Sequence, residues 1–361
     1  MTFLDYQATT PLAPEALAAM LPWLESQHAN PHSPHREGRR AKAAVEVARD
    51  QVAVLLPSGG RVAFTSGATE ALNWAIKGTT GPIVTLATEH AAVLDTVAAE
   101  ATRGRQVTII PVGRDGVVDL DEARAAIRPG TGLVAAMLVN NEIGVIQPIA
   151  ALAEIAHAAG ALMLCDAVQG YGRVPVPDTV DLIAISAHKI HGPKGIGALW
   201  IRDGVDIAPL MHGGGQEVPG RSGTLSPALC AGFGVAAKLM ADRKNQDAAH
   251  VDRLWALACA RLGPDWTING ASDHRYHGNF NVRRANLDVN RLMSDLRDIA
   301  FSAGSACATG SGRSSHVLSA IGLTEAQARA SIRLGFGRYT TETELRDAID
   351  AIVTAAEAQW S

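Results

Sequence analysis

Seven short apolar runs alternate with alanine-rich helical segments between residues 61 and 202. Such runs, bounded by turn residues, are typical of buried strands, and the segments between them are typical of helical crossover connections. The alternation predicts an α/β fold with a mainly parallel seven-stranded sheet and helices on both faces. The expected strands are Val62–Thr65, Ile83–Leu86, Val107–Pro111, Val134–Val139, Leu162–Cys165, Leu182–Ser186 and Ala198–Ile201. The expected helices between them include Ala91–Arg103, Leu120–Ile127 and Ile149–Ala159.

The N-terminal region differs from this pattern. Residues 1–14 contain two prolines and have no helical period, which predicts an extended arm. Helices are expected over Glu15–Gln27 and Ala41–Leu56, with the polar stretch NPHSPHREGRR as a turn between them.

The pattern changes again beyond Pro227. Two helices, Ala228–Arg243 and Val251–Leu262, lead into a mixed α/β tail that ends in an amphipathic helix over Glu342–Gln359. Thr341 and Glu344 fit a capping box at the start of that last helix. We predict a large domain over residues 15–245 and a smaller α+β domain over residues 246–361, with the 1–14 arm packed on the small domain.

A lysine follows one of the expected strands, in the stretch DLIAISAHKIHGPKGIGALW. Ser186, His188 and Lys189 come at the end of the apolar run, and a glycine-rich turn follows. Open α/β sheets bind ligands outside the carboxyl ends of their strands. A desolvated lysine there can lose its proton and form a Schiff base. The alternative is a solvated loop lysine.

Other strand ends also carry polar residues. Thr65–Glu70 opens a helix with free N–H groups, hydroxyls and a glycine, which suits a phosphate, although an ordinary N-cap is the alternative. His90 follows the next strand and could stack on a flat ligand or transfer a proton. Asp166 follows Leu, Met and Cys, so its charge needs a partner, either a protonated ring nitrogen or a structural salt bridge. Together with Lys189 these are the groups that pyridoxal phosphate requires.

Composition excludes several functions. The net charge of −4 and the pI near 6.3 predict neither nucleic-acid binding nor attachment to an anionic membrane. The apolar run Leu133–Val139 is far shorter than the ~20 residues that span a bilayer. Asp5 interrupts the N-terminus before a signal-peptide hydrophobic region could form. These features predict a cytoplasmic protein.

The metal-binding and cysteine patterns are sparse. His32 and His35 stand three residues apart, but no acidic or cysteine partner is near, so we expect no metal site. The four cysteines form no CxxC pair, which argues against a disulfide framework or a zinc site. Cys307 is flanked by SAGSA and ATGSG, small residues typical of an exposed loop, and an exposed free thiol suggests chemistry. Cys165, Cys230 and Cys259 lie among apolar residues and are interpreted as packing.

Long motifs in this sequence resemble those of one enzyme family, and they cover nearly the whole chain. They are LDYQATTP, NPHSPHREGR, FTSGATEALNWAIKG, ATEHAAVL, VNNEIGVIQPI, CDAVQ, SAHKIHGPKGIGAL, GGGQEVPGRSGT, SAGSACATGSGRSSHVL and SIRLGFGRYTT. The sequence resembles the cysteine desulfurases of the iron–sulfur-assembly and nitrogen-fixation kind. These belong to the class-V aminotransferase family of fold-type-I enzymes, whose cofactor is pyridoxal 5'-phosphate.

The resemblance implies a role for each matching residue. Lys189, not Lys194, would carry the cofactor covalently, and Asp166 would pair with the ring nitrogen. The ring would stack on His90, and Gln169 would bond its hydroxyl. The phosphate would be held by Ala68, Thr69, Ser186 and His188, together with Thr224 of a second subunit in a homodimer with shared active sites. The carboxylate of L-cysteine would be bound by Asn141 and Arg333, and Cys307 would be the nucleophile.

The implied reaction converts L-cysteine to L-alanine and leaves a persulfide on Cys307. An iron–sulfur scaffold or a sulfur-carrier protein would then accept the sulfur. The sequence departs from the family in a short segment Phe280–Arg297, in GRSSHVL in place of an acidic-proline lead, and in ending soon after Trp360. The alternatives are a selenocysteine lyase, another class-V enzyme such as an aminotransferase, and a catalytically silent scaffold.

Overall fold

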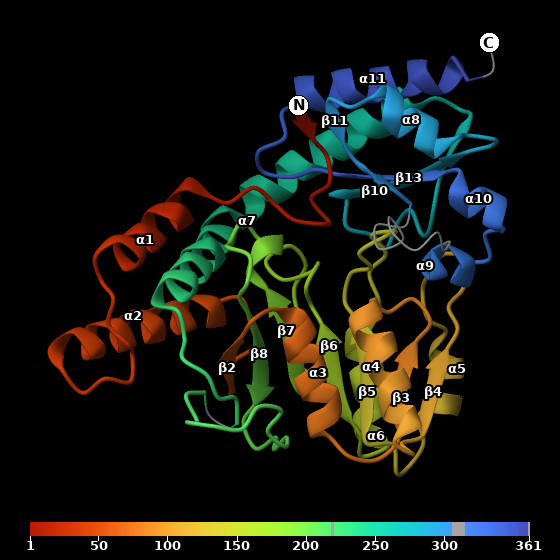
Figure 1. Ribbon diagram of the computed structural model, residues 1–361. Helices are drawn as coiled ribbons and strands as arrows, with labels where there is room; N and C mark the ends of the chain where they lie inside the picture. Colours follow the sequence, from red (N-terminus) through yellow and green to blue (C-terminus); the bar gives the residue numbers. More distant parts are fainter. Residues whose placement is uncertain (218–219, 305–314, 360–361) are drawn as a thin grey trace.

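A seven-stranded sheet forms the centre of the larger part of the molecule (Figure 1). The computed structural model describes residues 1–217, 220–304 and 315–359. The order of strands in the sheet is β2-β8-β7-β6-β5-β3-β4, and only β8 runs antiparallel to its neighbours. All seven predicted strands are confirmed, as β2 (Gly60–Thr65), β3 (Ile83–Leu86), β4 (Val107–Ile110), β5 (Leu133–Met137), β6 (Leu162–Asp166), β7 (Leu182–Ser186) and β8 (Gly197–Arg202).

Helices cover both faces of this sheet, as the runs of apolar residues predicted. Successive residues of a strand point to opposite faces, so Ile183 and Ile185 of β7 join one core while Leu182 and Ala184 join the other. One face packs against α3 (Ala68–Gly78) and α4 (Ala91–Thr102). The other packs against α1 (Pro14–Glu25), α2 (Arg36–Ala53), α5 (Leu120–Ala126), α6 (Ile149–Ala158) and α7 (Pro227–Leu262).

A second, four-stranded antiparallel sheet lies above the first in Figure 1, in the order β12-β13-β10-β9. Its core is shared with the end of α7 and with the C-terminal helix, which begins at the predicted capping box of Thr341 and Glu344. The strands and helices of this part are β9 (Trp266–Ile268), β10 (Asn279–Arg284), α8 (Val289–Asp295), β11 (Ile299–Ala300), β12 (Ser302–Ala303), α9 (His316–Ala320), α10 (Glu325–Arg329), β13 (Ser331–Gly335) and α11 (Glu342–Glu357).

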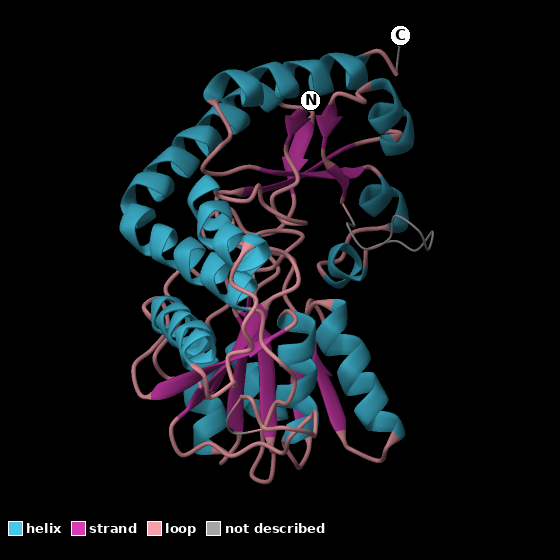
Figure 2. Ribbon diagram, turned by 60° about the vertical axis from the view of Figure 1, so that its left-hand side comes forward, coloured by secondary structure: helices cyan, strands magenta, loops and turns pink. Residues whose placement is uncertain are grey.

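Helix α7 connects the two sheets and corrects one expectation. The sequence predicted two helices separated near residue 245, whereas a single helix runs from Pro227 to Leu262 (Figure 2). Its first half packs on the large core, its last turns pack on the small core, and the polar residues between them are largely solvent-exposed. The domain boundary near residue 245 remains a prediction, and it falls inside this helix.

The N-terminal arm contacts both sheets. Strand β1 (Thr2–Phe3) pairs with β11, and the N–H of Gly335 in β13 donates to the carbonyl of Leu4 at 2.7 Å. Further along, Thr10 and Ala13 donate backbone hydrogen bonds to the carbonyls of the turn that follows β7. The arm therefore passes between the small sheet and the predicted lysine site.

The polar stretch before α2 is partly helical, which corrects a second expectation. Helix α2 begins at Arg36, and the ring of His35 caps it by accepting a bond from the N–H of Gly38 at 3.1 Å. The charged residues of this first turn are exposed, while Gly38 and Ala41 are buried. The stretch NPHSPHREGRR therefore contains both the predicted turn and the first residues of α2.

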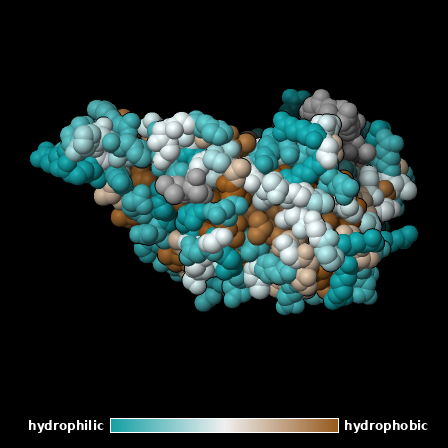
Figure 3. Space-filling view, turned by 90° about the horizontal axis from the view of Figure 1, so that it is seen from below, coloured by the Kyte–Doolittle hydropathy of each residue, from teal (hydrophilic) through white to brown (hydrophobic). Residues whose placement is uncertain are grey.

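The described residues contain no candidate membrane-spanning helix. None of the helices there is both long and apolar enough to cross a bilayer. At the end of the molecule that faces away from the small sheet, hydrophilic and hydrophobic residues are interspersed (Figure 3).

Candidate active site

A cavity of about 600 Å³ lies at the carboxyl ends of the parallel strands. The strand ends that line it are those of β2, β5, β6 and β7, joined by the β3–α4 loop, the N-terminal arm and Arg333 of β13. Parallel strands end at one edge of a sheet, so their C-terminal residues converge there. Ten residues expected to bind cofactor or substrate line this cavity: Ala68, Thr69, His90, Asn141, Asp166, Gln169, Ser186, His188, Lys189 and Arg333.

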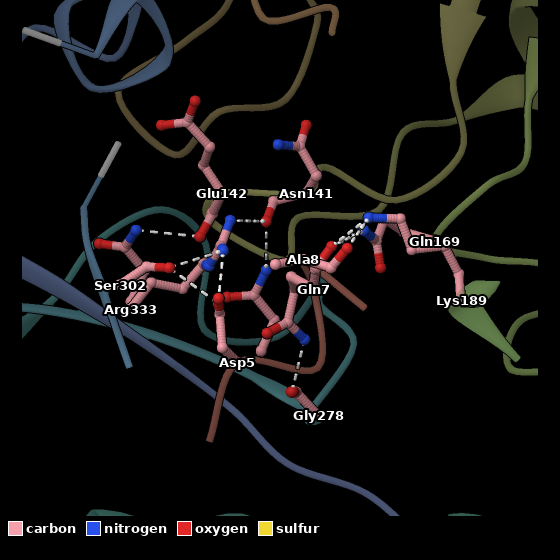
Figure 4. A network of polar contacts seen from close by, with 12 residues as sticks. Asp5, Gln7, Ala8, Asn141, Glu142, Gln169, Lys189, Gly278, Ser302 and Arg333 are labelled. Atoms are coloured by element: carbon pink, nitrogen blue, oxygen red, sulfur yellow. Dashed lines mark hydrogen bonds and ion pairs between the residues drawn. The ribbon is translucent and has the colours of Figure 1, made fainter. Parts of the chain in front are cut away.

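Lys189 is placed by the short 3-10 turn η1 (Ala187–Lys189) that follows β7. Its Nζ donates to the backbone carbonyls of Gln7 at 2.5 Å and Ala8 at 2.9 Å (Figure 4). Burial, with the positive charges of Arg333 and Arg173, lowers the pKa of Lys189 to about 8. The neutral, nucleophilic form of the amine is therefore far more populated near neutral pH than in an ordinary lysine.

Asp166, the last residue of β6, and His90, the N-cap of α4, both line the cavity. Asp166 is buried at the end of β6, where its Oδ1 accepts from the N–H of Val168 at 3.0 Å. Burial raises the pKa of Asp166, whereas the Val168 bond and the nearby His90 and Lys189 oppose that shift. A cation placed against this carboxylate would stabilise its charged form.

The ring of His90 is fixed by its role as the N-cap of α4. Its Nδ1 accepts from the N–H of Ala92 at 3.0 Å. Burial lowers the pKa of His90, so the ring is neutral and its proton is assigned to Nε2. The imidazole therefore presents a fixed plane and one N–H donor.

The N-terminus of α3 lies at the cavity, where the N–H of Ser66 already donates to Glu70 at 2.7 Å. Its N-cap, Gly67, gives no side-chain capping bond, and Ser66, Gly67, Ala68 and Thr69 all line the cavity. A Cβ at Gly197 of β8 would lie only 2.8 Å from the backbone of Gly67, so the glycine permits this close approach. Free N–H groups at a helix start suit a phosphate group.

Arg333 of β13 also lines the cavity and is 1% exposed. Its Nη1 donates to the carbonyl of Asn141 at 3.0 Å and its Nη2 to Asp5 at 2.8 Å (Figure 4). Its Nε is buried and has no hydrogen-bond partner among residues 1–217, 220–304 and 315–359. A buried guanidinium with an unused donor at a cavity wall is suited to bind a carboxylate.

One expected site residue does not line the cavity, and another lies outside the described residues. Thr224 is solvent-exposed and is not among the residues that line it. Cys307 falls in 305–314, outside the described residues. The residues on either side of this segment are held near the cavity: Gly304 donates to the carbonyl of Ser331 at 2.7 Å, and Ser315 donates through its hydroxyl to Glu142.

The structure adds residues that the sequence did not single out. The carboxylate of Asp5 binds Arg333. The backbone carbonyls of Gln7 and Ala8 bind Lys189. Glu89, directly before His90, is buried, accepts from the N–H of Met137 at 2.8 Å, and has its pKa raised well above the ordinary value by burial. The motif LDYQATTP was the only available signal for the arm residues, and it did not specify their roles.

The structure also places three of the four cysteines. No cluster of His, Cys, Asp or Glu in the described part of the chain could hold a metal ion. Cys165 and Cys230 are buried, as expected, and burial raises the pKa of Cys230 to about 12. Cys259 is exposed on α7, so its assignment to packing was wrong.

Comparisons with known proteins identify the family of this chain. The model of the family "Aminotransferase class-V" matches residues 2–347. A mitochondrial cysteine desulfurase of Eremothecium gossypii is 44% identical, with 98% of this chain and 76% of that protein covered. The cysteine desulfurase IscS of Rickettsia typhi is 41% identical, with coverages of 97% and 90%.

Solved structures give the same result. A NifS-like protein superimposes with a TM-score of 0.91 at 32% identity, covering 99% of each chain. A structure described as SspA in complex with cysteine has a TM-score of 0.84 at 33% identity, covering 94% of this chain and all of the other. The chain therefore belongs to the aminotransferase class-V family, among its cysteine desulfurases.

Proposed function

We propose that the cavity binds pyridoxal 5'-phosphate on Lys189 and is the site where L-cysteine loses its sulfur. The observation that carries this proposal is the meeting, in one cavity, of a lysine whose pKa is lowered to about 8 with Asp166, His90 and the uncapped start of α3. These groups fit the cofactor: an amine for its aldehyde, a carboxylate for its ring nitrogen, a flat ring, and N–H donors for its phosphate.

Each of these protein groups would have a separate role. When bound, pyridoxal phosphate supplies an electrophilic aldehyde and a ring that accepts electrons. Asp166 would hold the ring nitrogen protonated, and burial strengthens that interaction because few waters compete for the carboxylate. The α3 N-terminus, Ser186 and His188 would hold the phosphate, Gln169 would bond the ring hydroxyl, and His90 would fix the plane of the ring.

Lys189 would have a second role once the substrate amine replaces it. Its neutral Nζ would take the α-proton of L-cysteine and return a proton later, as a general base and acid. The carbonyls of Gln7 and Ala8 lie within hydrogen-bond distance of Nζ and would receive the protonated amine between these steps.

The sulfur acceptor on the enzyme is proposed to be Cys307. Its thiolate would attack the sulfur of the activated substrate, so that a persulfide forms on Cys307 and the carbon skeleton leaves as L-alanine. A thiolate is required because the neutral thiol is a poor nucleophile. An iron–sulfur scaffold or a sulfur-carrier protein is proposed to take the sulfur from Cys307.

Arg333 and Asn141 are proposed to bind the substrate carboxylate, which leads to a direct test. Arg333→Lys should raise the KM for L-cysteine by about 10- to 100-fold, because lysine cannot make two parallel charge-assisted bonds. The visible spectrum of the bound cofactor should remain nearly unchanged. Steady-state kinetics and absorbance spectra of the two proteins give the answer, and unaltered kinetics would reject this role for Arg333.

We further propose a homodimer in which Thr224 of each subunit completes the phosphate site of the other. Thr224 is exposed in the single chain, and α1 presents Leu17, Leu21 and Leu24 to solvent along one stripe. A second copy would cover such a stripe. Sedimentation at assay concentration should give a dimer, and Thr224→Ala should weaken phosphate-dependent cofactor binding. A fully active monomer would contradict the proposal.

A selenocysteine lyase remains the second candidate, because the same cavity could bind selenocysteine. Turnover of selenocysteine without turnover of L-cysteine would favour it. The division into arm, large domain and small domain, and the cytoplasmic location, remain predictions, to be tested by limited proteolysis and by cell fractionation.

A further inference from the structure

The ion pair between Asp5 and Arg333 joins the first residues of the chain to the last strand of the small sheet. Asp5 Oδ1 accepts from Arg333 Nη2 at 2.8 Å and from the hydroxyl of Ser302 at 2.8 Å. The same hydroxyl lies 3.3 Å from Nη2, so the three groups form a closed triangle (Figure 4). Within the ranges that the structure describes, no other carboxylate pairs with Arg333.

These contacts fix the direction in which the guanidinium points. Nη2 donates to Asp5 and Ser302, and Nη1 donates to the carbonyl of Asn141 at 3.0 Å. Nε is the buried donor without a partner in the described ranges, and Arg333 lines the cavity. Arginine has many rotamers, so a fixed orientation of its planar group requires such contacts.

Asp5 is itself held firmly by backbone hydrogen bonds on both sides. Leu4 donates to Ala300 at 2.8 Å, and Tyr6 donates to Gly335 at 3.3 Å. The arm packs so closely on β13 that a Cβ at Gly335 would lie 2.7 Å from the nitrogen of Tyr6. The carboxylate therefore has little freedom to move away from Arg333.

We propose that Asp5 is the positioning residue for substrate-carboxylate recognition: it holds the guanidinium of Arg333 in one orientation at the cavity wall, with Nε left without a partner in the described ranges. The inference rests on the proposed function, in which Arg333 binds the carboxylate of L-cysteine. Asp5 does not touch the substrate. It acts by removing the other orientations of the guanidinium and by compensating a buried charge before substrate arrives.

The test compares two ligands that differ only in a carboxylate, L-alanine and ethylamine. Their dissociation constants are measured from absorbance changes of the holoenzyme, beside KM and kcat for L-cysteine. In Asp5→Ala we expect KM for L-cysteine and the dissociation constant for L-alanine to rise about tenfold, the effect of losing one charge-assisted hydrogen bond. Ethylamine binding should not change, and kcat should fall much less than KM rises.

Matched variants define the controls. Asp5→Asn keeps an oxygen that can accept from both Nη2 and Ser302, so it should recover part of the loss. Thr2→Ala alters the same arm at a residue without a side-chain bond to Arg333, and it should leave both ligands unaffected. If Asp5→Ala does not fold, Asp5→Ser takes its place, because its shorter side chain also withdraws from Nη2.

Three results would overturn the inference. Equal weakening of L-alanine and ethylamine would show that Asp5 has only a general structural role. Unchanged constants would show that Arg333 needs no positioning. A lower KM would show that Asp5 competes with substrate. Arg333→Ala distinguishes failure of the proposed role of Arg333 from failure of the inference about Asp5. If Arg333→Ala keeps the preference for L-alanine over ethylamine, the proposed role of Arg333 fails. If Arg333→Ala loses this preference and Asp5→Ala keeps it, only the inference about Asp5 is rejected.

Discussion

Lys189→Ala should lose the covalent visible absorbance of the cofactor and lower turnover of L-cysteine by about a thousandfold, the middle of the range for removal of a general base. The amine of Lys189 is the group expected both to attach the cofactor and to move the substrate α-proton. Alanine can do neither. Spectra of the purified variant, together with alanine formation from L-cysteine, provide the measurement.

Lys194→Ala is the matched control, because Lys194 lies only five residues further along and is exposed. It should keep the covalent absorbance. A borohydride-stable link between cofactor and protein in Lys189→Ala would show that another lysine carries the cofactor.

The same lysine predicts a pH dependence in the wild-type protein. Only the neutral amine attacks an aldehyde, and burial lowers the pKa of Lys189 to about 8. The rate at which cofactor-free protein attaches pyridoxal phosphate should therefore rise with pH through about 8 and level off above it. In Nα-acetyl-lysine the free ε-amine has a pKa of about 10.4, so the rate of its reaction with pyridoxal phosphate should continue to rise well beyond that pH.

Cys307→Ser should stop sulfur transfer while leaving cofactor binding intact. The side chains that bind cofactor and substrate carboxylate come from other parts of the chain, so the variant should stay yellow and change its spectrum when L-cysteine is added. A serine hydroxyl is a far weaker nucleophile towards sulfur and cannot store it as a persulfide. Alanine formation should fall by at least about a thousandfold, since replacing a catalytic nucleophile can cost about 10⁶-fold in kcat.

Two observations would contradict this role of Cys307. Near-normal alanine formation by Cys307→Ser would show that sulfur leaves without this thiol, and the lyase would become the better assignment. Recovery of alanine formation on addition of dithiothreitol would show that an external thiol can replace Cys307.

The strands and their terminal residues could be predicted because both depend on local sequence. A short apolar run that ends at polar and turn residues specifies a buried strand and its end together, as in Leu182–Ser186 followed by Lys189. Parallel strands then bring these ends to one edge, so residues far apart in sequence meet without further information.

The individual contacts of the arm and the continuity of the long helix could not be predicted in the same way. Asp5 and Arg333 are separated by 328 residues, and no local pattern reports such a contact. In α7 the polar residues around Asn245 interrupt the apolar period because they span the exposed stretch between two cores. A helix segment without a core to face lacks the pattern on which the prediction depends.

The site assignment is tested most directly by finding which residue carries the cofactor. The holoenzyme is reduced with borohydride, digested, and mapped by peptide mass spectrometry. The geometry predicts a single pyridoxyl group on Lys189, beside the carbonyls of Gln7 and Ala8. A pyridoxyl group on Lys194 or on any other lysine, with Lys189 unmodified, would contradict the assignment.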